Sequence, residues 1–197
     1  MRKVLVLSLL TLWAGHVQGA TIIYTDESLF AAQLQSPYYL EDFTGLSNPL
    51  PANQDFGPVN GYSFQAHADN GLYANPDAIS TFSPGDILHL SFTGSTVNAA
   101  GGIFTATDMF GGTVPQTLKV EASDGTLQSV STTGFVGFIS DSAITWLEVS
   151  SDAVAPDFFP QADHLYSGVS VPEPALIGAA SIACTGLLLR KRKGASR

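Results

Sequence analysis

The sequence predicts a mostly β protein: an antiparallel β-sandwich with one short N-terminal helix, followed by a single transmembrane helix at the C-terminus. From residue 38 onward, short apolar or alternating stretches are separated by Gly, Pro, Asn and Asp, which is typical of sandwiches and barrels. Leu88, Leu90 and Phe92 alternate with the more polar His89 and Ser91, as in a half-buried antiparallel strand. The only continuous apolar run outside the N-terminus is residues 175–189.

The first elements expected along the folded region are a strand and a helix. Residues 21–24 form a short β-branched run, which predicts a strand. Thr25 is the expected N-cap of a helix that extends to about Gln35, since Asp26 and Glu27 occupy its first turn and Leu29, Phe30 and Leu34 have helical spacing.

The remaining elements are predicted as strands joined by turns. We expect strands at residues 38–43, 62–67, 87–92, 102–107, 117–122, 127–132, 135–140, 143–149 and 164–169. Ser123-Asp124-Gly125 is the clearest hairpin signal, because Asp-Gly supplies the positive φ values of a tight turn. Residues 44–61 and 108–115 are expected as longer loops, and loops of that length are functional or mobile.

The chain length of 197 residues allows one domain with processing segments at both ends. Residues 1–20 read as a signal peptide: Arg2 and Lys3 precede an apolar stretch at 4–14, and cleavage is expected after Gly19 or Ala20. Residues 21–170 are the predicted domain. Because the apolar stretch is shorter than the roughly 20 residues that span a bilayer, a permanent N-terminal anchor is the weaker alternative.

Residues 171–197 form the second predicted processing segment. Its prolines keep the backbone around Glu173 extended. The following residues 175–189 would make a helix of about 22 Å, marginally short for a bilayer. A basic cluster then follows: Arg190, Lys191, Arg192 and Lys193. Because Lys and Arg stay cytoplasmic, residues 20–170 are expected outside the inner membrane. A plain tail anchor is the alternative interpretation.

The order Pro172-Glu173-Pro174, apolar helix and terminal basic run resembles the PEP-CTERM substrates of exosortases in Gram-negative bacteria. That resemblance implies a membrane peptidase as partner, a transient inner-membrane anchor, and final placement at the cell surface or in the extracellular polysaccharide matrix. Ala175 departs mildly from the Ser or Thr common in the family. Residues 20–170 also resemble the jelly-roll ectodomain of many of these proteins. The resemblance rests on short sequence motifs such as Gly134-Phe135-Val136-Gly137-Phe138.

Charge and cysteine content exclude several kinds of function. Residues 20–170 contain sixteen Asp and Glu residues and one base, Lys119, for a net charge of −15. Such a domain cannot neutralise phosphates, so nucleic acid is not an expected partner. The single cysteine, Cys184, lies in the apolar tail, which excludes an intramolecular disulfide and a thiol nucleophile in the domain.

Candidate catalytic and binding residues are sparse, and we expect no enzyme activity. No Gly-x-Ser-x-Gly occurs, and the four histidines are scattered without zinc-ligand spacing. By resemblance to jelly-roll carbohydrate-binding modules, a structural Ca²⁺ could lie between Glu41, Asp42 and Asp163, although solvated acids are the simpler interpretation. A sugar platform could use three aromatic residues, although strand aromatics are usually core: Tyr62, Phe64 and Tyr73.

The sequence therefore favours an exported, exosortase-sorted protein with a structural or adhesive role. A carbohydrate-binding module for matrix polysaccharide is the first alternative, and a polysaccharide hydrolase is the second. The residues alone do not choose among these three.

The sorting hypothesis predicts the location and mass of the protein in its native host. Wild-type protein is expected outside the cell, with a mass that ends near Pro172-Glu173-Pro174. Glu173→Ala is expected to keep full length and stay in the membrane. Intact mass spectrometry of fractionated cells measures both, and a full-length wild-type protein in the membrane would contradict the hypothesis.

Overall fold

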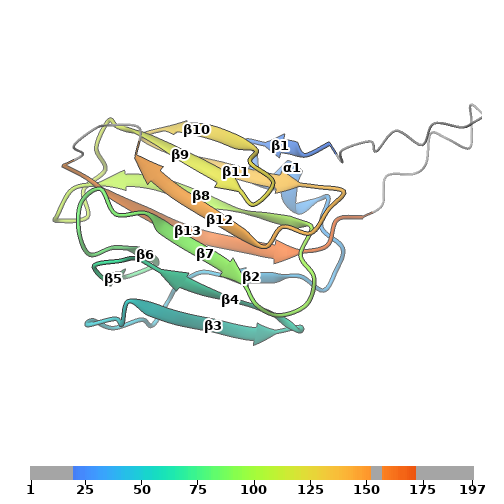
Figure 1. Cartoon of the computed structure of the whole chain (residues 1–197), viewed down its shortest axis with the longest axis horizontal. Helices are drawn as coiled ribbons and strands as arrows, with labels where there is room; N and C mark the ends of the chain where they lie inside the picture. Colours follow the sequence, from blue (N-terminus) through green and yellow to red (C-terminus); the bar gives the residue numbers. More distant parts are fainter. Residues whose placement is uncertain (1–19, 152–156, 172–197) are drawn as a thin grey trace, which may run out of the picture.

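Two antiparallel β-sheets pack face to face in the computed structural model, which describes residues 20–151 and 157–171 (Figure 1). The seven-stranded sheet has the order β1 (Ile22–Tyr24), β11 (Thr133–Ile139), β8 (Ala99–Thr107), β13 (Phe159–Gly168), β6 (Ala78–Thr81) and β5 (Leu72–Asn75), and β2 (Tyr39–Glu41) also pairs with β13. The six-stranded sheet has the order β10 (Leu127–Ser131), β9 (Thr117–Ala122), β12 (Trp146–Ser151), β7 (Leu88–Phe92), β4 (Tyr62–His67) and β3 (Asn53–Val59). The predicted antiparallel sandwich is confirmed.

The core lies between the inner faces of the two sheets. Along β9, Leu118, Val120 and Ala122 are fully buried, while Lys119 and Glu121 point to the opposite face. Burying one large apolar side chain contributes roughly 1.5–3 kcal/mol to the stability of the fold. A shift of the strand by one residue would expose these side chains, so their burial fixes the register. Strand β4 of the same sheet alternates in the same way, so both strands place every second side chain on the outer face of the six-stranded sheet.

Helix α1 (Glu27–Ala31) is shorter than the predicted N-terminal helix and begins one residue later. Asp26, not Thr25, is the N-cap, and its carboxylate accepts the backbone N–H of Leu29 at 2.9 Å. After the helix the backbone turns toward the sheet, and the N–H of Gln35 donates to the carbonyl of Val169, the residue that follows β13, at 2.8 Å.

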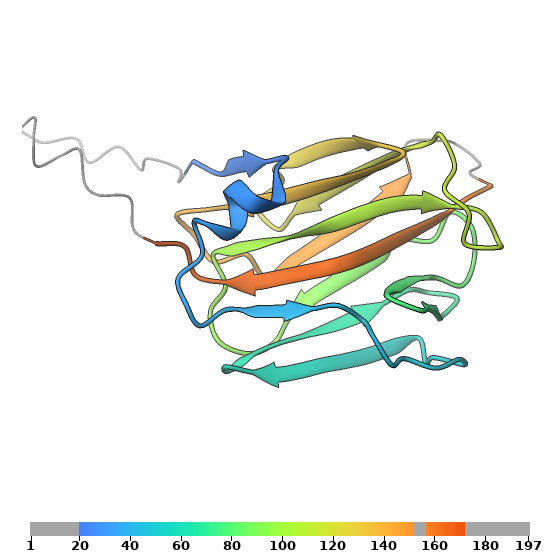
Figure 2. The same ribbon diagram turned by 180° about the vertical axis from the view of Figure 1, so that it is seen from behind.

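Helix α1 packs on the outer face of the seven-stranded sheet at the end where β11 and β1 lie (Figure 2). Phe30 is fully buried there, with its ring centroid 5.3 Å from that of Phe135 and 6.0 Å from that of Tyr166. Gly137 makes the approach possible, since a Cβ at that position would lie 2.4 Å from the Phe30 ring. No second helix within residues 20–151 and 157–171 covers the rest of this face.

Most strand predictions are confirmed within a few residues, and the Asp124-Gly125 hairpin joins β9 and β10 as expected, with Gly125 at a φ of 83°. Three strands were not predicted. Strand β3 lies within residues 44–61, which were expected to be a loop, and β5 and β6 form a short hairpin. The predicted signal cleavage residue Gly19, the transmembrane helix and the sorting motif lie outside the described residues.

Phe30→Ala is expected to lower the free energy of unfolding by about 3–5 kcal/mol, because it removes the ring that joins α1 to the sheet. Leu29→Ala is the matched control, since the Leu29 side chain on the same helix is 62% exposed. Urea unfolding of the two variants and the wild type measures the difference. Equal stabilities would show that α1 contributes little to the fold.

Candidate functional site

A β-bulge in strand β13 decides which of its side chains reach the surface. The pairing of β13 with β8 shifts between Asp163 and Tyr166, where β13 carries one extra residue. His164, at the bulge, has a φ of 44°. Ala162 and Leu165 are consequently both in the core, although three residues apart, while Tyr166 packs under α1 on the outer face.

Two of the three predicted calcium ligands bond to their own neighbours in the sequence, at the end of β2. Glu41 accepts the backbone N–H of Phe43 at 2.8 Å and, through its other oxygen, the hydroxyl of Tyr39. Asp42 Oδ1 accepts the N–H and the hydroxyl of Thr44 at 3.0 and 2.8 Å. These bonds from Thr44 lower the pKa of the Asp42 carboxyl.

The third predicted ligand, Asp163, lies in a different electrostatic environment. Burial raises the pKa of its carboxyl, His164 opposes the shift through its charge and its N–H, and Asp77 and Glu27 add to it. Within residues 20–151 and 157–171, no three His, Cys, Asp or Glu side chains are grouped so that they could hold a metal ion. Calcium binding by Glu41, Asp42 and Asp163 stays a prediction.

The structure corrects the predicted aromatic platform. Tyr62 and Phe64 are core residues, since they lie on the inner face of β4, and the Phe64 ring stacks on that of Phe56 at a centroid distance of 4.7 Å. Only Tyr73, on the outer face of β5, is exposed. The three predicted aromatic residues are therefore separated: Tyr62 and Phe64 lie in the interior and Tyr73 lies on the surface.

Tyr73 belongs instead to a groove at the end of the sandwich away from α1, where the β5–β6 hairpin faces the segment after β8 (Figure 2). Its volume is about 480 Å³. Four large apolar side chains on its lining are exposed to solvent: Tyr73 by 44%, Phe82 by 62%, Met109 by 74% and Phe110 by 87%. We call this feature the aromatic groove.

The loop that presents Met109 and Phe110 is held by its own hydrogen bonds. Asp108 Oδ1 accepts the backbone N–H groups of Phe110 and Gly112, both at 2.8 Å, and the N–H of Asp108 donates to the carbonyl of Gly112 at 2.8 Å. Gly111 has a φ of 80°, and a Cβ on Gly112 would lie 2.9 Å from the Asp108 carboxylate. The two exposed apolar side chains thus stand on a turn with a defined shape.

A second hollow, of about 320 Å³, continues from the aromatic groove and shares Asn75 and Phe110 with it. Its polar lining includes Gln161, Asp77 and Asp163. Asn75 donates from its side-chain nitrogen to the amide oxygen of Gln161 at 2.6 Å. In the described part of the chain, that bond leaves the Asn75 oxygen and the Gln161 amide nitrogen available to a ligand.

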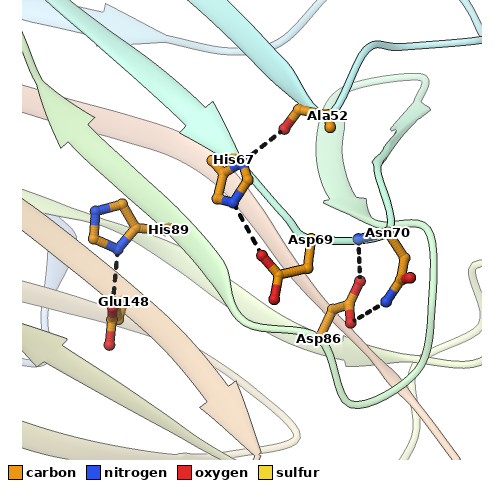
Figure 3. Close-up of polar contacts among 7 residues, drawn as sticks. All are labelled: Ala52, His67, Asp69, Asn70, Asp86, His89 and Glu148. Carbon is orange, nitrogen blue, oxygen red and sulfur yellow. Dashed lines mark hydrogen bonds and ion pairs between the residues drawn. The ribbon is translucent and has the colours of Figure 1, made fainter.

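The outer face of the six-stranded sheet carries a separate polar cluster (Figure 3). His89 Nδ1 lies 2.9 Å from Glu148 Oε1, and the His89 ring lies over Trp146 at a centroid distance of 5.6 Å. His67 Nε2 lies 3.2 Å from Asp69 Oδ1. Figure 3 shows two separate His–carboxylate pairs from neighbouring strands rather than one relay.

Of these two features, the aromatic groove is the stronger candidate for ligand binding. It combines exposed rings, unpaired amide atoms and carboxylates in one concave surface, the combination that orients small polar ligands. The sequence indicated Tyr73 as a binding residue and residues 108–115 as a functional or mobile loop, but it did not indicate Phe82 or Gln161. The pairing of β5 with β6, and of β6 with β13, brings those segments together.

Asp163→Asn is expected to raise the thermal midpoint at pH 7. A carboxyl whose pKa is raised by folding stabilises the fold most at low pH, and that contribution is lost as pH rises through the raised pKa. The neutral amide avoids this loss, so the difference between variant and wild type should shrink below about pH 4, where both side chains are neutral. Thermal unfolding followed by circular dichroism measures it.

The same assay tests the calcium hypothesis. Calcium bound by Glu41, Asp42 and Asp163 would raise the midpoint of the wild type, EDTA would reverse the rise, and Asp163→Asn would abolish it. An unchanged midpoint with calcium or EDTA contradicts that hypothesis. A lower midpoint for Asp163→Asn at pH 7 without calcium would contradict the raised pKa.

No protein-family model, curated protein or solved structure matched the chain. Among residues 20–151 and 157–171, none of the helical structure is long and apolar enough to cross a membrane. The case for a function therefore rests on the residues of this chain and their geometry.

Proposed function

We propose that this chain is an exported surface or matrix protein whose sandwich is a non-catalytic, adhesive module that binds extracellular polysaccharide. The observation that carries the proposal is the aromatic groove, where Tyr73, Phe82 and Phe110 expose their rings around a concave surface. Contiguous exposed apolar side chains on a soluble domain are typical of binding sites.

The chemistry of the groove suits a sugar chain. A pyranose ring has apolar C–H faces that pack on aromatic rings, and hydroxyls at its edge that need hydrogen-bond partners. Asn75 and Gln161 offer an amide oxygen and an amide nitrogen beside the rings. The turn closed by Asp108 holds Phe110 in place before binding, which reduces the entropy lost when a ligand is bound.

The sequence supports the location of this module. Pro172-Glu173-Pro174, the apolar residues 175–189 and the basic cluster resemble an exosortase sorting signal. An exosortase-type peptidase would release the domain from a transient inner-membrane anchor to the cell surface or the polysaccharide matrix. An acidic domain stays soluble there without disulfides, because its core is large enough to be stable alone.

The arrangement of strands supports the jelly-roll relationship. From β8 to β13 the chain crosses between the two sheets four times, with β8, β11 and β13 in one and β9, β10 and β12 in the other. Such crossings are the connections that wind jelly-roll sandwiches. The groove is lined by β5, β6 and the segment after β8, and Figure 2 shows these elements at the end of the sandwich away from α1.

Phe110→Ala and Tyr73→Ala are each expected to weaken binding of the domain to matrix polysaccharide about two- to tenfold, because one aromatic stacking contact contributes roughly 0.5–1.5 kcal/mol. Leu29→Ala, which removes an exposed apolar side chain from α1, is the control and should bind as the wild type does. Co-sedimentation with purified polysaccharide measures the affinities.

Equal affinities for all four proteins would contradict the groove as the binding site. Release of new reducing ends by the wild type would favour a hydrolase, and this activity should then be lost in Asp163→Asn or Asp77→Asn, whose carboxylates line the hollow that continues from the groove.

A further inference from the structure

The charges around the aromatic groove are all negative. Asp108 lines the groove itself, and Asp77 and Asp163 line the hollow that continues from it. In the described part of the chain the only Lys or Arg is Lys119, which lies on β9 in the other sheet and points away from the core. A ligand in the groove therefore experiences a negative potential.

Asp77 and Asp163 differ from ordinary surface acids in how the backbone places them. Asp77 lies in the two-residue turn between β5 and β6, since Asn75 pairs with Ala78. Asp163 lies at the β13 bulge, which is fixed by the burial of the residues on either side of it. Both carboxylates are thus held on rigid elements at the rim of one hollow.

The surroundings of Asp163 disfavour the ionised form of its carboxyl. Its carboxyl is partly buried, and the negative charges of Asp77 and Glu27 act on it, so burial and repulsion together raise its pKa despite the opposing effect of His164. His164 itself pairs with Glu27, 3.6 Å from Nδ1 to Oε1. A cation in the hollow would relieve this repulsion.

The rings add to the attraction for a cation. The face of a Tyr or Phe ring attracts an ammonium group within about 6 Å of its centroid. Phe110 lines both hollows and Tyr73 lines the first, so a positively charged group there would lie between aromatic faces and carboxylates.

We propose, on the basis of the function proposed above, that the groove selects cationic glycans: chains of amino sugars whose nitrogen is not acetylated and carries a proton. The rings and amides bind the sugar units, and Asp77 and Asp163 pair with their ammonium groups. Polymers of uronic acids or sulfated sugars are repelled, and neutral or N-acetylated chains bind through the rings and amides without the ion pairs.

The test compares three oligosaccharides of equal length: a β-linked glucosamine hexamer, its N-acetylated form and a hexamer of a uronic acid. Titration calorimetry at about pH 6 keeps the sugar amines protonated, and about 0.15 M salt shortens the reach of unspecific attraction to about 8 Å. The variants are Asp77→Asn and Asp163→Asn, which test the charges, and Phe110→Ala, which tests the rings. The control is Asp69→Asn, which removes one charge from an exposed side chain outside the groove.

The wild type is expected to bind the glucosamine hexamer most tightly and the uronic acid hexamer least. Asp77→Asn and Asp163→Asn should each lose about two- to fivefold of the affinity for the glucosamine hexamer, as expected for a partly exposed ion pair of up to about 1 kcal/mol. The same variants should bind the N-acetylated hexamer as the wild type does. Asp69→Asn should leave all three affinities unchanged.

Other outcomes separate this inference from the proposed function. The charge selection is overturned if the acetylated and free-amine hexamers bind equally and neither Asp77→Asn nor Asp163→Asn changes the affinity. If Phe110→Ala still weakens binding in that case, glycan binding by the groove remains supported. An equal loss in Asp69→Asn would mean general attraction to an acidic domain and would also overturn it. No effect of Phe110→Ala on any hexamer would contradict the groove itself.

Discussion

Strand β13 is the element on which the rest of the structure depends. It pairs with β8 along most of its length, with β6 near its start and with β2 near its end, so it joins three parts of the chain into one sheet. Its bulge lets Ala162 and Leu165 enter the core while Asp163 and Tyr166 serve the outer face. One irregular strand therefore positions the core, the site under α1 and the rim of the groove.

The parts of the fold that follow regular alternation could be predicted from sequence, and the irregular parts could not. Strands β4 and β9 match their predicted limits because apolar residues alternate cleanly along both. Strand β3 contains Gly57-Pro58 and lies at a sheet edge, where few side chains are buried, so no pattern marks it. The first five residues of β13 alternate in burial, but their buried positions are Pro160 and Ala162 and the bulge follows them, so no alternation of large apolar residues marks this half of the strand.

The candidate site was less predictable, because its residues come from segments far apart in sequence. An aromatic residue in a strand can face either side, and only the register decides that Phe64 is buried while Tyr73 is exposed. The groove then combines features that do not help folding: exposed rings on a fixed turn, and a carboxylate whose charge is disfavoured where it lies. Such local costs are typical of binding sites rather than of structural surfaces.

The most direct test of this account is to map where a glycan contacts the domain. We would titrate a glucosamine oligomer into the ¹⁵N-labelled domain and follow its backbone amide signals by nuclear magnetic resonance. The account predicts that the shifted signals gather at the groove, around Tyr73, Asn75, Phe110 and Gln161. Shifts centred on His89 and Glu148 at the other sheet, or no shifts at millimolar oligomer, would contradict it.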